Sequence, residues 1–256
     1  MFIKKTKASL LHLFISALVV GIFASFALFI WHPSPFLQIS GLMSILLILV
    51  TVDLILGPLL TFIVYKPKKP SLRFDLAFIG TVQISALLYG MYTIHQGHPA
   101  YIAYTVDRFT LINIADVNPL DAKHTALQAS GWWKPIMVYS QPPTDPSEKE
   151  RLIFEVLEGK PDIDARPEYY EPFDKFANKV MQKGLTPQQL SSTPESNQKL
   201  EVFIAKHGKT TNDYAYLPLV GKEKDVLWVW DKTTEQPVGT LDINPWQVSK
   251  VAANNY

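Results

Sequence analysis

The chain has 256 residues, with 24 basic and 23 acidic side chains and a formal net charge of +1. This near balance disfavours a nucleic-acid-binding protein, which presents a basic surface to phosphate. Cysteine is absent, so disulfides, thiol catalysis and cysteine-ligated metals are excluded. Apolar residues are concentrated in about the first 95 positions, so we expect a transmembrane module over residues 1–95 and a separate folded domain over residues 96–256.

The first hydrophobic segment, Leu10–Trp31, follows a short basic start and is long enough to be a membrane helix. A cleaved signal peptide is the alternative, because Ser25 and Ala27 resemble a cleavage site, but the apolar run continues past them. Small residues recur at every fourth position, at Ala17, Gly21 and Ser25, and such a stripe lets another helix approach closely. We expect this stripe to pack within the chain rather than to form a dimer.

The second segment, Ile39–Tyr65, is apolar except for Asp53 near its middle. A carboxylate at that depth costs about 2.5–3.5 kcal/mol on insertion scales. Gly57 and Pro58 follow one turn later, and Pro58 cannot donate to the carbonyl of residue 54, so we expect a kink beside the acid. Asp53 is therefore either a hydrogen-bonded contact inside the helix bundle or a contact to a partner helix. Counting along the helices brings two polar side chains of the third segment to the same depth, Gln83 and Ser85.

A second basic cluster, between residues 66 and 73, precedes the third hydrophobic segment, Phe74–Ile94. The positive-inside rule then places the N-terminus and this loop in the cytoplasm and everything after about residue 95 outside. For a bacterial inner-membrane protein the outside is the periplasm. The cytoplasmic parts are too short to hold a kinase or a sensor output domain, so any activity lies in the membrane or in the outer domain.

The outer domain is predicted to be an α+β domain with an antiparallel sheet. Alternating and β-branched residues indicate strands at 100–106, 109–114, 132–139, 225–231 and 237–244. The first two form a hairpin that turns at Asp107 and Arg108, where Arg108 is exposed and either contacts a partner or is simply solvated. Helices are expected at 147–158, 173–181, 186–190 and 196–207. The first of these turns four apolar residues toward the core, Leu152, Phe154 (or Ile153), Val156 and Leu157.

The outer domain lacks G-x-S-x-G, H-E-x-x-H and any Gly-rich phosphate loop followed by a helix. His95 and His98 have metal-ligand spacing, but no nearby motif supplies a third ligand, so a solvated turn is the better interpretation. Asp116, Asn118 and Asp121 are better explained as a helix cap than as a calcium site. The acids at 162, 164, 168 and 171 lie in a proline-rich stretch that gives no reason for a raised pKa. We therefore expect no metal, no cofactor and no catalytic residue. The clustered tryptophans are expected in the core rather than on a ligand platform: Trp132, Trp133, Trp228, Trp230 and Trp246.

Three stretches carry a family resemblance. They are Val52–Tyr65, with a D-x-x-x-G-P run at Asp53–Pro58, then Arg73–Thr93, and Tyr104–Val117, with V-D-R-F at Val106–Phe109. In these stretches, and in its layout of three spans and an outer domain, the chain resembles the type IV pilin accessory proteins of the TfpX/TfpZ family.

The resemblance implies a non-catalytic inner-membrane factor that stabilises or helps to assemble a cognate major pilin. Its implied partners are that pilin, the lipid bilayer and the pilus assembly machinery, with no nucleic acid. Pilins of the general kind carry a charged N-terminus and a nearby acid in an apolar helix, so a polar group for Asp53 to meet is expected. The candidate partner-binding residues are Asp53, Gly57, Pro58 and Arg108. The alternative is a membrane-anchored periplasmic enzyme that modifies pilin or envelope glycan.

Overall fold

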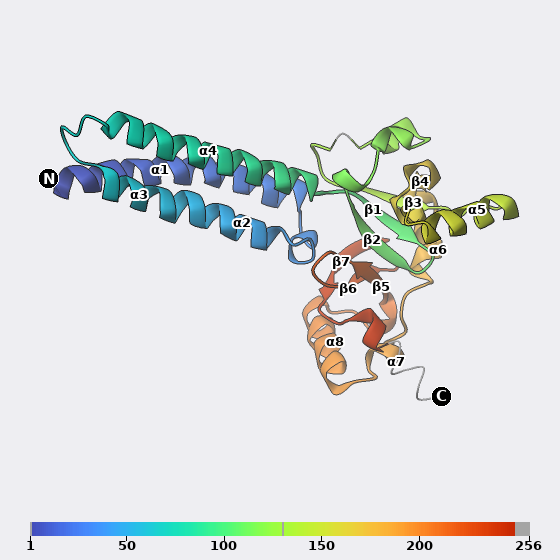
Figure 1. Ribbon diagram of the computed structural model, residues 1–256. Coiled ribbons are helices and arrows are strands. Elements are labelled where there is room, and N and C mark those ends of the chain that lie inside the picture. Colours follow the sequence, from blue (N-terminus) through green and yellow to red (C-terminus); the bar gives the residue numbers. More distant parts are fainter. Residues whose placement is uncertain (1, 130, 249–256) are drawn as a thin grey trace. The chain divides into compact units, whose positions relative to one another are not determined.

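The computed structural model describes residues 2–129 and 131–248 (Figure 1). The chain forms two compact units. The first, here called the helical unit, holds Met1–Pro33 and Gly41–His98, and the second, the sheet unit, holds Ser34–Ser40 and Pro99–Tyr256. The connector Ser34–Ser40, which joins the first two long helices, therefore belongs to the sheet unit.

Three helices of the helical unit are long and apolar enough to cross a membrane, which confirms the prediction of three such segments. They cover Phe2–Trp31, Leu42–Val64 and Leu72–Gln96. The first consists of α1 (Phe2–Phe26) and a π-helical turn, η1 (Ala27–Trp31), and the third is α4. The three helices run alongside one another (Figure 1).

The second span changes helix type beside its acidic residue. α2 (Leu42–Val50) passes into a π-helical segment, η3 (Thr51–Leu56), and then into α3 (Gly57–Val64). Pro58 lies in the first turn of α3, and the wider i→i+5 bonding of η3 accommodates its missing N–H. The irregularity expected beside Asp53 is therefore a π-helical segment rather than a simple proline kink.

The sheet unit is built on a seven-stranded sheet in the order β4-β3-β1-β2-β5-β6-β7. Its strands are β1 (Pro99–Thr105), β2 (Arg108–Asn113), β3 (Ile136–Ser140), β4 (Tyr170–Pro172), β5 (Tyr214–Val220), β6 (Val226–Asp231) and β7 (Gln236–Leu241). The pairs β1–β3 and β2–β5 are parallel and the other four are antiparallel. The α+β class is confirmed, but the prediction of an antiparallel sheet is wrong at these two junctions. Both parallel pairs join strands separated by long crossovers, which alternation within a strand does not reveal.

β5 is a central strand that the sequence pattern did not indicate. Pro218 stands in its middle and cannot donate to a ladder, which argues against a central strand. The structure accommodates it because the β2–β5 ladder pairs only Phe109 with Leu219 and Thr110 with Val220, both beyond the proline.

The helices of the sheet unit lie close to where they were predicted. They are α5 (Pro146–Leu157), α6 (Ala177–Met181), α7 (Pro187–Leu190) and α8 (Pro194–His207). Side-chain oxygens of Asp145, Thr186 and Thr193 cap the starts of α5, α7 and α8. The cap at Asn118 is also confirmed, but it begins only a 3₁₀ turn, η5 (Pro119–Asp121).

α5 corrects the expectation about its inward face. Leu152 is buried, whereas its other large apolar residues are exposed, including Ile153, Phe154 and Leu157. Besides Leu152, the helix contacts the rest of the sheet unit through charged side chains. Glu155 pairs with Arg166 at 2.5 Å, and Arg151 donates to the hydroxyl of Tyr169 at 3.2 Å. The helical spacing of the apolar residues in α5 was predicted correctly, but the polar face of the helix makes the contacts with Arg166 and Tyr169.

Alternate residues of the strands bury opposite faces of the sheet. On β6, Trp228 and Trp230 join the core on one face, while Leu227 and Val229 pack with α7 and α8 on the other (Figure 1). These two tryptophans confirm the prediction of core aromatics.

The connector contributes to this same core. Phe36 and Ile39 are buried in it, and the Phe36 ring meets the Trp228 ring edge-on at 5.6 Å. The carbonyl of Ile39 accepts the backbone N–H of Glu223 at 3.0 Å. The core of the sheet unit is thus completed by residues that precede it by more than sixty positions in the chain.

Candidate functional site

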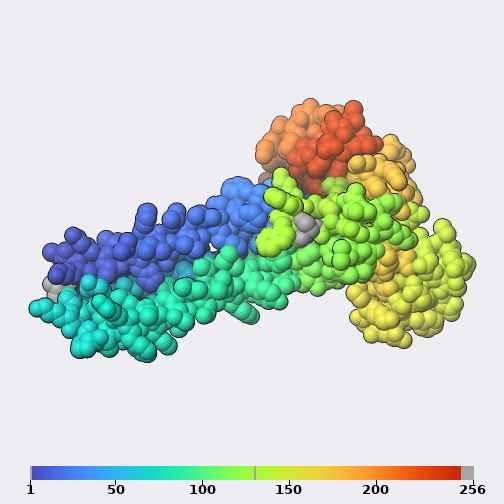
Figure 2. All heavy atoms as spheres, turned by 90° about the horizontal axis from the view of Figure 1, so that it is seen from above, coloured from blue at the N-terminus to red at the C-terminus, as the bar shows by residue number. Residues whose placement is uncertain are grey.

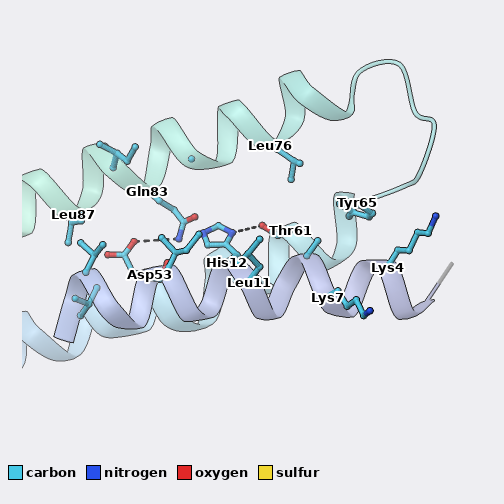
Figure 3. A pocket seen from close by; sticks show the side chains of 17 residues that line it. Lys4, Lys7, Leu11, His12, Asp53, Thr61, Tyr65, Leu76, Gln83 and Leu87 are labelled. Carbon is cyan, nitrogen blue, oxygen red and sulfur yellow. Dashed lines mark hydrogen bonds between the residues drawn. The ribbon is translucent and has the colours of Figure 1, made fainter. Parts of the chain in front are cut away.

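A groove of about 860 Å³ lies in the helical unit between α1 and α4, with α3 at its floor (Figure 3). Most of its lining is aliphatic. Five polar side chains also line it, Asp53, Gln83, His12, Thr61 and Ser16, and Lys4, Lys7 and Tyr65 stand toward the end that holds the N-terminus. The side chains of α1 (blue) and α4 (teal) can be followed along each other in Figure 2.

Asp53 lies in the middle of its span, eleven residues after Leu42 and eleven before Val64. It is 4% exposed, and Gln83 on α4 is 8% exposed. Gln83 Nε2 donates to Asp53 Oδ1 at 3.4 Å, a long hydrogen bond (Figure 3). Among the described residues, Asp53 Oδ2 and Gln83 Oε1 have no hydrogen-bond partner. The groove therefore holds two buried acceptor atoms that need donors.

Gly57 permits this arrangement. A Cβ at position 57 would overlap the side-chain amide of Gln83, so a larger residue there requires Gln83 to leave the position in which it crosses α3 and reaches Asp53. Pro58 contributes through its carbonyl, which accepts the Ser9 hydroxyl at 2.8 Å and joins α3 to α1. The D-x-x-x-G-P run thus combines an acid, a passage for its partner and an interhelical contact.

His12 and Thr61 form a second polar pair at the groove, with His12 Nδ1 and Thr61 Oγ1 2.6 Å apart. Neither His12 nor Thr61 was singled out from the sequence as a site residue. A signal was present, because Asp53, Gly57 and Thr61 recur at every fourth position and therefore share one helix face.

The remaining residues expected to pack between helices lie elsewhere. Ala17, Gly21 and Ser25 are all exposed, and among the described residues nothing beyond the neighbouring residues and backbone of α1 lies within 4 Å of a Cβ placed on Gly21. The stripe does not pack against the described helices, contrary to our expectation. Ser85 is also exposed, on a face of α4 that does not meet Asp53.

Arg108 lies in the sheet unit, apart from this groove. The hairpin turns at Val106 and Asp107, one residue earlier than predicted, so Arg108 is the first residue of β2. Its Nε donates to Asp107 Oδ1 at 2.7 Å, and its guanidinium stacks over the ring of Trp246 at 4.6 Å. Trp246 Nε1 in turn donates to Asp225 Oδ2 at 2.6 Å. Arg108 is therefore half-buried and held in place rather than freely solvated.

Three other expectations need correction. His98 is fully buried and stacks on Trp31 with ring centroids 4.9 Å apart, so it does not lie in a solvated turn. Trp132 and Trp133 are exposed rather than in the core. Burial raises the pKa of Asp164, although its proline-rich surroundings gave no reason to expect it. Within residues 2–129 and 131–248, no group of three or more His, Cys, Asp or Glu is placed to hold a metal ion.

Residues 1–41 match the model of a protein family described as fimbrial assembly protein FimB. Three fimbrial assembly proteins of Dichelobacter nodosus are similar to the chain over 118 residues, or 45% of its length. The serogroup I protein is 31% identical over 46% of its own length, and the serogroup E1 protein 30% over 46%. The protein of serogroups C1 and C2 is 30% identical over 90% of its length.

The match thus spans about half the length of the serogroup I and E1 relatives and most of the shorter one. No solved structure matches the chain. Because it matches nearly the whole length of the serogroup C1 and C2 relative, the chain belongs to the fimbrial assembly protein family.

Proposed function

We propose that this protein is a non-catalytic accessory factor of type IV pilus assembly that holds a cognate major pilin in the membrane. Three points support the proposal. The relatives are named as fimbrial assembly proteins, and the resemblance to the TfpX/TfpZ family implies a pilin as the partner. The groove of the helical unit offers a seat for the apolar helix of such a pilin.

The observation that carries the proposal is the pair of buried acceptors without donors, Asp53 Oδ2 and Gln83 Oε1. A lipid tail could fill the groove, but it would leave both acceptors unsatisfied. The long bond between the two side chains offsets little of the cost of a buried carboxylate, because intramembrane hydrogen bonds average about 0.6 kcal/mol. An apolar helix with an ammonium group or another donor would fill the groove and also donate to the buried acceptors. The charged N-terminus expected of a pilin has this chemistry.

Membrane orientation is part of the proposal. The basic residues flanking the spans favour an inner-membrane protein with a cytoplasmic N-terminus and a periplasmic sheet unit. A reporter that fluoresces only in the cytoplasm should be bright when inserted at Lys68 and dark when fused after Tyr256. A bright C-terminal fusion would contradict this orientation.

A substitution in the sheet unit distinguishes the proposed non-catalytic factor from the alternative, an enzyme that acts on pilin or envelope glycan. Asp164 is the acid there whose pKa burial raises, which is the property expected of a general acid. We propose no catalytic role for it, so Asp164→Asn should leave piliation and pilin mass unchanged. An altered pilin mass with normal levels of this protein would favour the enzyme.

Two substitutions at Asp53 test the groove. Asp53→Leu removes an insertion penalty, and Asp53→Asn retains a hydrogen-bonding group while it removes the charge. If Asp53 contacts the pilin, both variants accumulate normally in the membrane but lose pilin crosslinking and reduce piliation. Ser85→Ala, on an exposed face of α4, is the matched control and should behave as wild type.

If Asp53 only joins helices within the chain, Asn should be near wild type and Leu should lower the thermal stability of the helical unit. Normal piliation in both Asp53 variants would remove Asp53 from the proposed function.

A further inference from the structure

Two adjacent tryptophans of the sheet unit remain unexplained by the groove. Trp132 is 58% exposed and Trp133 is 69% exposed. They follow Gly131, whose positive φ of 74° turns the chain, and exposed Lys134 comes next. Adjacent exposed apolar side chains form a contiguous surface, and such surfaces mark contact sites in a way that singly scattered apolar residues do not.

The backbone attaches this pair near the end of α4. Gly131 approaches the side chain of Ile114, with 3.2 Å between a Cβ placed on the glycine and Ile114 Cγ1. Ile114 follows Asn113, which pairs with Pro99 at the start of β1. Pro99 comes three residues after Gln96, where α4 ends.

A second attachment lies on the same segment. The hydroxyl of Tyr101 donates to the carbonyl of Leu127 at 2.6 Å and accepts the N–H of Ala129 at 3.1 Å. The three residues from Gln96 to Pro99 span at most about 10 Å, and the paired Cα atoms of Pro99 and Asn113 lie about 5 Å apart. The tryptophans are therefore held within a few residue lengths of the point where the chain leaves the membrane.

The chemistry at that level favours lipid over protein. Tryptophan and tyrosine concentrate at the membrane–water interface, where an apolar ring with one polar atom fits the headgroup region. Tyr89 and Tyr92 are exposed on the last turns of α4 and begin such a belt. Lys134 supplies a cation that suits lipid phosphate.

We propose that Trp132, Trp133 and Lys134 form an interfacial loop that inserts into the headgroup region of the leaflet in which α4 ends. The occupant of this surface is lipid. The loop gives the sheet unit a membrane contact beyond its covalent links to the spans, and it limits how far this part of the unit moves from the bilayer. The inference is independent of which protein the groove binds.

A label on the loop tests this directly, because the chain has no cysteine to remove. Lys134→Cys, labelled with an environment-sensitive fluorophore in the full-length protein, is reconstituted into liposomes that contain no other protein. Its emission should be blue-shifted and quenched several-fold more by lipids brominated near the headgroup than by unbrominated lipids. The control is Leu157→Cys on the exposed face of α5, whose label should show aqueous emission in liposomes of brominated and of unbrominated lipid alike.

Adding Trp132→Ser and Trp133→Ser to Lys134→Cys should move the emission to the aqueous value and abolish the quenching. Far-ultraviolet circular dichroism checks that the variants stay folded. Aqueous emission at position 134 with both tryptophans present would overturn the proposal. So would lipid quenching that persists without them, since the label alone would then explain the contact.

Discussion

Phe36 offers the sharpest test of how the connector and the sheet unit depend on each other. Its ring is buried against Trp228, in a core whose other members, apart from Ile39, come from residues beyond position 100. Truncating a buried phenylalanine costs about 3–5 kcal/mol, from the lost burial and the cavity left behind. For a domain of this size about 1 kcal/mol lowers the melting temperature by ~2–4 °C, so Phe36→Ala should lower it by about 6–20 °C.

The measurement is the thermal melting of tryptophan fluorescence in the full-length protein in nanodiscs, with protease resistance of the sheet unit as a second readout. Gln38→Ala is the matched control, because Gln38 lies in the same short helix, Phe36–Gln38, and is exposed. Exposed substitutions of this kind change stability by about 0.5 kcal/mol or less. Equal melting of the two variants would show that the connector is not part of the sheet-unit core.

Three further predictions concern single contacts. Gly57→Ala should displace Gln83 and reduce pilin crosslinking as Asp53→Leu does, whereas Gly21→Ala, with none of the described residues beyond its neighbours and the backbone of α1 within 4 Å of the added methyl, should not; equal crosslinking in both would contradict the role of Gly57. Arg108→Glu should reduce pilin recovery at an unchanged level of this protein if Arg108 contacts the pilin, and unchanged recovery would restrict Arg108 to its contacts with Asp107 and Trp246. The hydrogen bond from Lys209 holds the pKa of Asp231 in the folded protein below its ordinary value. The ionised Asp231 therefore stabilises the folded sheet unit above about pH 3.9, and this stabilisation is lost as the pH falls through the lowered pKa. Asp231→Asn should therefore weaken the acid dependence of sheet-unit unfolding, and an unchanged acid profile would refute this.

Local patterns in the sequence predict much of this fold, and the misses have identifiable causes. Long apolar runs locate the three spans, and alternation locates β1, β2 and β6, because these signals depend on neighbouring residues. Pairings across long crossovers have no local signal, so the parallel junctions of β1 with β3 and of β2 with β5 were not anticipated.

The direction in which an amphipathic helix faces is a similar case. The period of α5 indicates two faces, but which face meets the protein depends on its partners, and Arg166 and Tyr169 select the charged one. The position of Phe36 in a distant core is equally invisible to a periodic pattern.

The candidate site was predictable in its elements and not in its shape. One acid in an apolar span, followed by Gly-Pro, singles out Asp53, and depth counting indicates Gln83. That Gly57 makes room for Gln83, and that α1 and α4 leave a groove above both, depends on how three helices pack. The spacing of four residues between Asp53, Gly57 and Thr61 was the local sign that these three residues share one helix face.

The groove is tested most directly by photocrosslinking to the cognate pilin in intact membranes. A photoreactive residue is placed at Ile84, which lines the groove, and in a matched variant at Val82, which lies on α4 outside it and has similar exposure, 52% against 60%. The proposed function predicts a pilin adduct from position 84, little from position 82, and loss of the position 84 adduct when Asp53→Asn is added. Equal adducts from both positions, or an adduct at 84 that does not depend on Asp53, would contradict it.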